Sequence, residues 1–287
     1  MSIEDEKDLI IDLYKQKHGS TYLSKLTGYS PAYICKKLKD WGVQIWSHHE
    51  IASKYSFNEH FFDNINTEEK AYWLGFIYAD GYITKGYLRN GLGISISIKD
   101  IDHLKKFKEA IQATNPIRTY INKTGFKENT QYCRLILHSK KLCDTMIKQG
   151  VVEHKTNILK PPPFLPDELK HHFIRGYIDG DGCIACSHRK KKTMVSIEYA
   201  VKILGTEQIL DFIKKFVEDH EIAKINRYYK RKPEQIVQSL EIHGNKKVKQ
   251  FLDCLYKDAT VYLDRKYQRY CDLTELSNSR LTVKADK

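Results

Sequence analysis

The sequence predicts an α+β protein made of two pseudo-symmetric halves and preceded by a small all-α unit. Residues 71–81 (AYWLGFIYADG) and 172–182 (HFIRGYIDGDG) match at an offset of 101. Each copy is followed by alternating apolar and polar residues, which are typical of antiparallel strands. Residues 5–39 instead have helical periodicity. The expected organisation is a helical module at 1–48, a linker at 49–66, a first half at 67–160 and a second half at 161–287.

The length and composition indicate globular domains. The chain has 287 residues, of which 41% are hydrophobic, so it can bury two cores and is neither disordered nor fibrous. No stretch approaches the ~18–20 uncharged apolar residues of a membrane span, and the acidic start does not resemble a secretory leader. We therefore expect an intracellular protein, in the cytoplasm, the nucleoid or an organelle, that is not secreted and contacts no membrane.

The charge balance favours a nucleic-acid partner. Lys and Arg number 48 against 36 Asp and Glu, a formal charge of +12, and clustered cations gain affinity for phosphates through counterion release. The densest runs are residues 188–192 and 227–232, and the second interleaves cations with tyrosines. Either run alone is also typical of an exposed hairpin tip. The runs supply the candidate DNA contacts Arg189, Lys190, Arg227 and Lys230.

Seven cysteines, an odd number, favour reduced thiols over a disulfide framework. Cys183 and Cys186 form a CxxC pair, but no second ligand pair follows at the spacing of a structural zinc site. Strand packing is the favoured interpretation of this pair.

The N-terminal region is expected to hold three short helices. The first two cover residues 5–17 and 19–26, and Gly28 separates them from a third. Ser30 can cap that third helix, with a proline at its first position. This order resembles the helix-turn-helix of DNA-binding proteins, whose last helix enters the major groove. Lys36 and Lys37 are then candidate DNA contacts; a plain three-helix bundle is the alternative.

Each half is expected to contain a helix, two strands, a helix, two strands and a closing helix. The offset between the halves rises from 101 at the repeated helices to 105 at the later strands, residues 135–138 and 240–243. The four extra residues therefore lie in the first hairpin of the second half, which holds the Arg-Lys run.

The repeated helices carry small residues four apart on one face. These pairs are Gly75 with Ala79 and Gly176 with Gly180. A face of this kind can approach another backbone closely. We therefore expect the two helices to pack against each other at a pseudo-twofold axis and to end together.

Each repeated helix ends in an acid followed by glycine, Asp80-Gly81 and Asp181-Gly182, and the glycines are expected in the left-handed conformation that stops a helix. Two carboxylates at adjoining helix C-termini repel each other and the helix dipoles unless a cation lies between them. Oxygen ligands favour Mg²⁺, with Mn²⁺ or Ca²⁺ as substitutes, and a phosphodiester as substrate. The predicted metal site comprises both acids together with Gly81 and Gly182.

These two segments resemble the LAGLIDADG motif of homing endonucleases, and the resemblance covers roughly residues 57–280. It implies a saddle of antiparallel strands in the DNA major groove, with metal held by Asp80 and Asp181. The implied activity is a Mg²⁺-dependent, site-specific double-strand cut by a monomer that reads a long asymmetric site and hydrolyses one phosphodiester on each strand. The first motif has Tyr78 where the second has Asp179, a position that is not a metal ligand.

The resemblance also implies a lysine near the cleaved phosphate. Lys155 holds that position in the first half, as a third catalytic residue. The matching residue of the second half is Ala259, so Lys257 or Lys266 would have to serve there.

Further candidate contacts come from the repeat. His138 and His243 occupy equivalent strand ends, where they could contact phosphate or water or lie as structural histidines under the sheet. Lys99 and Lys202 are expected at the ends of the second strands, with side chains able to face the DNA backbone.

Two alternative functions remain open from the sequence. A DNA-binding regulator on this fold usually loses the acids, whereas a maturase that helps a host intron RNA fold can keep them. A self-splicing intein is rejected, because the sequence lacks a nucleophile at its start and a His-Asn pair at its end.

Overall fold

The structure is a computed structural model that describes residues 2–16, 18–45, 55–85, 90–122, 130–152, 157–191, 194–230, 232 and 234–285. Lys155 and the rest of residues 153–156 lie outside the described residues. The chain divides into two compact units, Met1–Ser56 and Phe57–Lys287. No helix of the described chain is both long and apolar enough to span a membrane.

The N-terminal unit contains the three expected helices, α1 (Lys7–Lys15), α2 (Ser20–Thr27) and α3 (Pro31–Asp40). Gly28 ends α2 with a φ of 79°, the left-handed conformation that glycine tolerates best. The Ser30 side chain accepts a hydrogen bond from the Tyr33 N–H, as expected of an N-cap. The helices enclose a small core of Ile3, Ile10, Tyr14, Leu23, Ile34 and Leu38.

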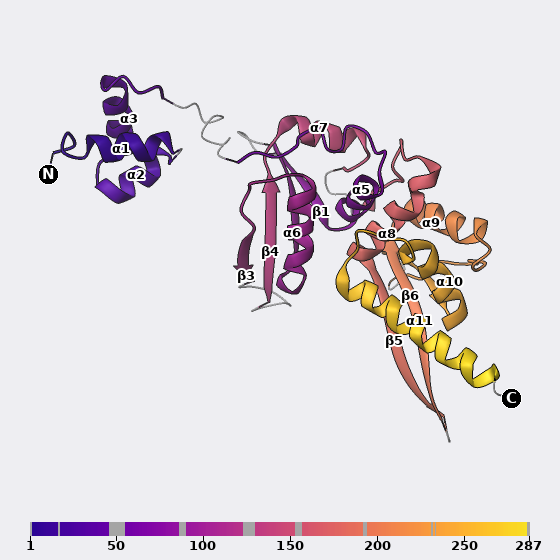
Figure 1. Ribbon diagram of the computed structural model, residues 1–287. Coiled ribbons are helices and arrows are strands. Elements are labelled where there is room, and N and C mark those ends of the chain that lie inside the picture. Colours follow the sequence, from indigo (N-terminus) through magenta and orange to yellow (C-terminus); the bar gives the residue numbers. More distant parts are fainter. Residues whose placement is uncertain are drawn as a thin grey trace. The chain divides into compact units, whose positions relative to one another are not determined.

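The first half of the larger unit follows the expected element order (Figure 1). Its elements are α5 (Glu68–Asp80), β1 (Gly81–Lys85), β2 (Asn90–Ser97), the 3₁₀ turn η1 (Ile98–Asp100), α6 (Ile101–Ala110), β3 (Arg118–Ile121), β4 (Gln131–Leu137) and α7 (Lys140–Lys148). All strands are antiparallel, in the order β1-β2-β4-β3. One face of the sheet packs against α6 and α7, and the other is open.

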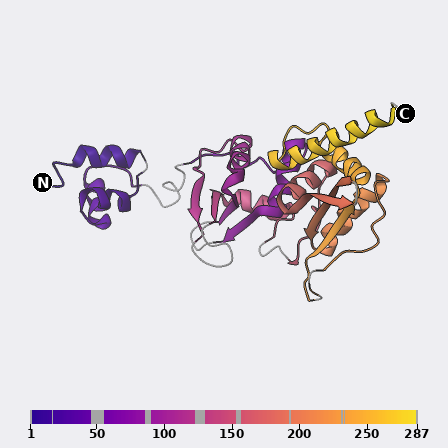
Figure 2. The ribbon, with the colours of Figure 1, turned by 90° about the horizontal axis from the view of Figure 1, so that it is seen from below.

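The second half repeats this plan with one strand fewer. Its elements are η3 (Asp167–Leu169), α8 (Lys170–Asp181), β5 (Gly182–Lys191), β6 (Met194–Gly205), α9 (Glu207–Asp219), β7 (Gln238–His243), α10 (Asn245–Tyr256) and α11 (Asp264–Ala285). The sheet order is β5-β6-β7, with α9 and α10 on the buried face. The β5–β6 hairpin is longer than β1–β2, which confirms the predicted insertion. Figure 2 shows α11 running along the outside of this half.

The prediction of a further edge strand in the second half is wrong for the described residues. Only an isolated antiparallel bridge joins Tyr229 to Ser239. The segment around Tyr229 holds the basic run 227–232, and charged side chains on an edge limit pairing. The edge is thus reduced to a single pair of hydrogen bonds.

The linker prediction is also too long. Residues 57–66 belong to the larger unit, where Phe61, Phe62 and Ile65 are buried in its core. Their aromatic and apolar side chains have no sustained periodicity, so the sequence pattern alone did not place them there.

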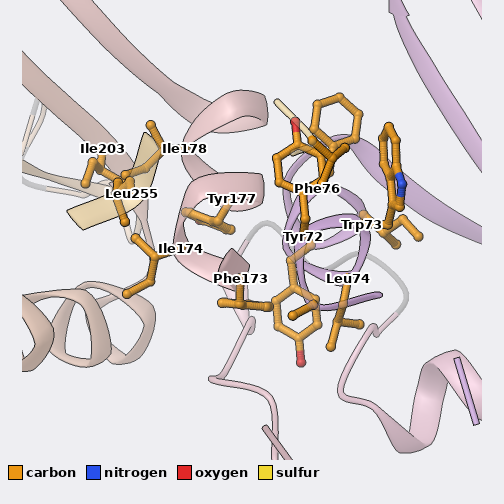
Figure 3. Packing of buried hydrophobic residues seen from close by; sticks show 14 of the residues in the cluster. Tyr72, Trp73, Leu74, Phe76, Phe173, Ile174, Tyr177, Ile178, Ile203 and Leu255 are labelled. Atoms are coloured by element: carbon orange, nitrogen blue, oxygen red, sulfur yellow. The ribbon is translucent and has the colours of Figure 1, made fainter. Parts of the chain in front are cut away.

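The two repeated helices, α5 and α8, pack directly against each other, as predicted. A Cβ added to Gly75 would lie 2.0 Å from the Phe173 carbonyl oxygen, and one on Gly176 would lie 2.0 Å from the Tyr72 carbonyl oxygen. These contacts exchange equivalent residues of the two copies, so a pseudo-twofold axis passes between the helices. Figure 3 shows Tyr72 of α5 and Phe173 and Tyr177 of α8 beside this contact.

Candidate metal centre and nucleic-acid interface

The two motif acids lie at the adjoining ends of the paired helices. Asp80 is the last residue of α5 and Asp181 the last of α8. A Cβ on Gly180, beside Asp181, would lie 2.2 Å from the Ala79 Cβ and 3.3 Å from the Asp80 Oδ2. Asp80 is half-buried and Asp181 is exposed. The helix contact thus brings two carboxylates of different halves to one site that solvent can reach.

The glycines after these acids do not adopt the predicted left-handed conformation. Gly81 has φ −79° and ψ 161°, and Gly182 has φ −90° and ψ 163°, both extended. Glycine is required for steric reasons instead. A Cβ added to Gly81 would lie 2.6 Å from the Ile77 Cγ2, and one added to Gly182 would lie 2.6 Å from the Ile178 carbonyl oxygen. Glycine therefore lets each strand begin against the last helical turn, directly after the acid.

The donor chemistry of this site fits a hard divalent cation. Among the described residues, no three His, Cys, Asp or Glu side chains lie together as a ready metal cluster. The pair of carboxylates at Asp80 and Asp181 would leave other positions of an ion to carbonyls, water or phosphate, which suits Mg²⁺. Cys183 and Cys186 lie three apart on β5 and so point to opposite faces of the sheet.

A buried lysine lies at this end of α8. Lys266 of α11 is 3% exposed, and its Nζ donates to the carbonyl oxygens of Ile178, Asp179 and Gly182 at 2.5, 2.7 and 2.6 Å. Burial lowers the pKa of Lys266 to about 8, while the charges of Asp179 and Asp80 oppose that shift. The ammonium therefore offsets the negative end of the motif helix.

Of the two lysines named for the second half, the structure brings Lys266 to the motif. Lys257 is exposed at the end of α10. The Gly182 carbonyl, a predicted metal ligand, already accepts one hydrogen bond from Lys266, which leaves it one lone pair for another partner.

Asp179 is a buried structural acid, consistent with the expectation that it is not a metal ligand. It is 1% exposed and accepts hydrogen bonds from the Tyr72 hydroxyl at 2.7 Å, the Tyr256 hydroxyl at 2.6 Å and the Leu263 N–H at 2.8 Å. Burial is the main influence on the pKa of Asp179 and raises it. Its counterpart Tyr78 instead donates to the Gln149 carbonyl at 2.6 Å. Each half thus ties its motif helix to a later segment of the same half, by different chemistry.

Sequence reasoning missed a second buried group, Arg175. This fully buried side chain donates to Glu68 Oε1 at 2.6 Å and to the carbonyls of Leu255 and Val261 at 2.7 and 3.0 Å. Its guanidinium lies 5.3 Å from the Tyr72 ring centroid. The signal was in the sequence: Arg175 is a charge among the apolar residues Ile174 and Tyr177 of the motif helix, where a buried partner is required.

The open face of the second sheet carries a polar cluster. Glu241 accepts from the Lys202 Nζ at 2.8 Å and from the Ser239 hydroxyl at 3.2 Å, and lies 3.1 Å from the His243 Nε2. Lys202 is inside β6, whereas Lys99 follows β2 in η1, so the expectation of matching strand-end lysines is wrong. The offset between equivalent residues of the two halves changes from 101 to 105 in this region, so the sequence did not reveal that the two lysines occupy different positions.

The two repeat-equivalent histidines are exposed at their strand ends. His138 follows β4 and His243 ends β7. The alternative that they lie under the sheet is therefore wrong, and both remain candidates for phosphate contact.

The basic runs lie on the second half as expected. Arg189 and Lys190 are in β5 near the hairpin end. The Arg227 guanidinium lies 4.8 Å from the Tyr229 ring centroid, an interleaving of cation and aromatic that the sequence suggested. Lys230 borders a cavity of about 810 Å³ together with Lys202 and Tyr229.

In the N-terminal unit the two α3 candidates differ. Lys36 is exposed, whereas the Lys37 Nζ lies 2.6 Å from Glu4 Oε1 and is partly shielded. The Trp41 Nε1 also donates to Glu4, at 3.1 Å. Glu4 thus ties the chain start to α3, and of the pair Lys36 is the cation left for an outside partner.

Comparison with known proteins supports the same motifs and fold. Residues 174–276 match the model of the LAGLIDADG endonuclease family. The fold is similar to the I-LtrWI LAGLIDADG homing endonuclease bound to target DNA (13% identity, 78% of this chain and 92% of that chain covered, TM-score 0.51). It is also similar to I-GzeII in complex with its DNA target (12% identity, 77% of this chain and 92% of that chain covered, TM-score 0.50). A third similar structure is I-SmaMI bound to uncleaveable DNA (11% identity, 73% of this chain and 92% of that chain covered, TM-score 0.50). A search of curated protein sequences finds no match.

These likenesses agree with the element order in both halves, the paired motif helices and the antiparallel sheets. The second-half sequence carries the family pattern, and the first half repeats it at the same helix position. The second half of the chain thus matches the LAGLIDADG endonuclease family model, and the fold is similar to that of LAGLIDADG homing endonucleases.

Proposed function

We propose that the protein is a site-specific endonuclease that cuts double-stranded DNA, one phosphodiester on each strand. The observation that carries this proposal is the meeting of Asp80 and Asp181 at the ends of two helices packed backbone to backbone. A pair of acids in this setting is unfavourable by itself, because each also meets a negative helix end. A cation-dependent reaction accounts for keeping both.

Asp80 and Asp181 would hold Mg²⁺, with Gly81 and Gly182 offering carbonyl oxygens beside them. When bound, the ion polarises a water and offsets charge that develops on the phosphate. The chain's own contribution is to orient these acids: the helix contact fixes both carboxylates relative to the same point. Lys266 supplies a fixed positive charge at the second motif, which favours a developing anion nearby. Lys155 is proposed to do the same for the first half.

The DNA would lie along the open faces of the two sheets, whose strands β1 and β5 begin directly after the acids. The three related proteins named above are described as bound to DNA. Both acids come from one chain, so a monomer is sufficient for two cuts. The unequal hairpins and the different side chains of the two faces favour an asymmetric site.

The basic contacts are proposed to divide into two classes. Lys99, Lys202, His138 and His243 lie around the sheets, and Arg189, Lys190, Arg227 and Lys230 lie towards the long hairpin and its edge. In the N-terminal unit, Lys36 of α3 would add a contact outside the cleavage core, with Lys37 contributing less because Glu4 already pairs with it.

The test is cleavage of a randomised DNA library by the full chain with Mg²⁺, followed by sequencing of the cut ends. We expect one enriched asymmetric site, cut on both strands. Sequence-selective binding without cutting would contradict the nuclease assignment and favour a regulator. Selective binding of a structured intron RNA, again without DNA cutting, would favour a maturase.

A further inference from the structure

The open face of the first sheet contains an arginine that lies beside two stacked aromatic rings. On β4, Tyr132 and Arg134 alternate with the buried residues Cys133 and Leu135. Because successive strand residues point to opposite faces, Tyr132 and Arg134 point away from the helices that cover the other face. This is the face that the proposed function places against DNA.

Two tyrosines lie close to this guanidinium. The Arg134 Cζ lies 5.2 Å from the Tyr120 ring centroid and 5.5 Å from that of Tyr132, and the two rings stack at 5.3 Å. Such contacts reduce the rotamer freedom that a long side chain loses on binding. The side chain is therefore arranged before any partner arrives.

Arg134 also has no acidic partner among the residues that the structure describes. No ion pair within the described chain includes it, and its buried Nε has no hydrogen-bond partner there. The second sheet is the opposite case, since Glu241 already pairs with Lys202. Arg134 thus presents hydrogen-bond donors with no internal acceptor.

We propose that Arg134 reads a guanine in the half-site bound by the first half. The arginine fork matches the O6 and N7 acceptors of guanine in the major groove, the commonest specific base contact. The inference deepens the proposed function and rests on its placement of DNA along the sheets.

The strand register locates this base relative to the cut. Arg134 pairs with Ser95, the neighbour of Ile94, which in turn pairs with Gly81 directly after Asp80. Two strand spacings of ~4.8 Å therefore separate Arg134 from the motif end, roughly 10 Å. At ~3.4 Å per base pair, the guanine lies roughly three base pairs from the phosphate nearest Asp80.

The test is a binding selection with the full chain, EDTA and a randomised DNA duplex, so that cutting is not needed. The unmodified protein should enrich guanine at one position. Arg134→Lys keeps the charge but loses the fork, so it should lose roughly 5- to 150-fold of that preference while its salt dependence stays unchanged. Arg134→Gln should shift the preference towards adenine, which glutamine recognises.

Arg118→Lys is the matched control, because Arg118 lies directly opposite Arg134 on β3 and is exposed. It should keep the guanine preference. Retained guanine selection by both Arg134 variants, or its loss only in the Arg118 variant, would overturn the assignment. Circular dichroism spectra identical to the unmodified protein establish that the variants are folded.

The selection also separates this inference from the nuclease proposal. A protein that selects guanine through Arg134 but never cuts DNA contradicts the proposed reaction and supports the base contact. A protein that cuts a defined site whose preferences do not change in either Arg134 variant supports the reaction and overturns the base contact.

Discussion

The Lys266 Nζ lies 2.6 Å from the carbonyl oxygen of Gly182, the residue that directly follows the motif acid Asp181. The Lys266 side chain is only 3% exposed to solvent. A buried cation at a helix C-terminus offsets the partial negative charge there. Because burial lowers the pKa of Lys266 to about 8, this side chain changes its charge at a lower pH than an ordinary lysine.

The first prediction concerns that charge. Burial lowers the pKa of Lys266 to about 8, so cutting at the second motif should decline as pH rises through about 8. Lys266→Met should slow that strand by roughly 10²- to 10³-fold, by analogy with a lost oxyanion donor. The measurement is the rate on a strand-specific end label from pH 6.5 to 9.5.

The pH dependence of the free energy of unfolding reports on Lys266 independently of cutting. The folded pKa lies below the usual 10.5 of lysine, so the unfolded chain binds more protons between about pH 8 and 10.5, and the free energy of unfolding should rise with pH in that window. Lys266→Met should lack this contribution. Lys257→Met, at an exposed position on the same half, is the control and should alter neither profile.

The second prediction tests the two acids proposed to hold the metal. Asp80→Asn or Asp181→Asn should abolish double-strand cutting and leave DNA affinity within a few-fold, because we expect affinity to come mainly from basic side chains on the sheets. Gel shifts and cleavage assays on the mapped target measure the two effects. Double-strand cutting by the Asp80→Asn, Asp181→Asn double variant would show that other groups perform the reaction.

The repeat made most of this fold predictable, because two copies of one pattern constrain each other. The small residues four apart on each motif helix predicted the α5–α8 contact, and the structure confirms it. What escaped was non-local: no periodicity reveals that Arg175 meets Glu68, a residue 107 positions away. The sequence shows that Asp179 stands in the second motif where the first motif has Tyr78. The partners of Asp179, Tyr72 and Tyr256, follow only from the tertiary fold.

The third prediction concerns the helix contact. Gly176→Ala would place a Cβ 2.0 Å from the Tyr72 carbonyl oxygen, so the backbones must separate. Overpacking of a core typically costs about 1–3 kcal/mol, and here the neighbouring atom is backbone, so we expect at least the upper end of that range. Chemical denaturation measures the change.

Glu69→Ala on the exposed side of α5 is its control and should change the free energy of unfolding by less than about 0.5 kcal/mol. A Gly176→Ala protein as stable as this control would mean that the helices are not in backbone contact.

The fourth prediction concerns the N-terminal unit. A chain that begins at Phe57 retains the whole larger unit and should cut the same phosphates, but with weaker binding and a shorter protected DNA segment. Lys36→Ala in the full chain should reproduce part of the affinity loss, whereas Leu9→Ala, exposed on α1, should not. An unchanged footprint after truncation would show that α3 does not contact DNA.

The fifth prediction uses the difference between the halves at the lysine positions. The first half has Lys155 where the second has Ala259, and the second has Lys266 at its motif helix. If each lysine stabilises charge at one phosphate, losing one should slow one strand and leave the other cut. Lys155→Ala and Lys266→Met should therefore both accumulate nicked DNA, with the nicks on opposite strands.

Supercoiled plasmid carrying the mapped site distinguishes nicked from linear product, and end labels identify the cut strand. Below pH 8 Lys266 is charged, so the unmodified protein should show its smallest difference between strand rates there and a larger one at pH 9, where only that cation is depleted. Nicks on the same strand in both variants would mean that the two lysines serve one phosphate. In that case the pseudo-twofold axis that relates the motif helices would not extend to the charges around them.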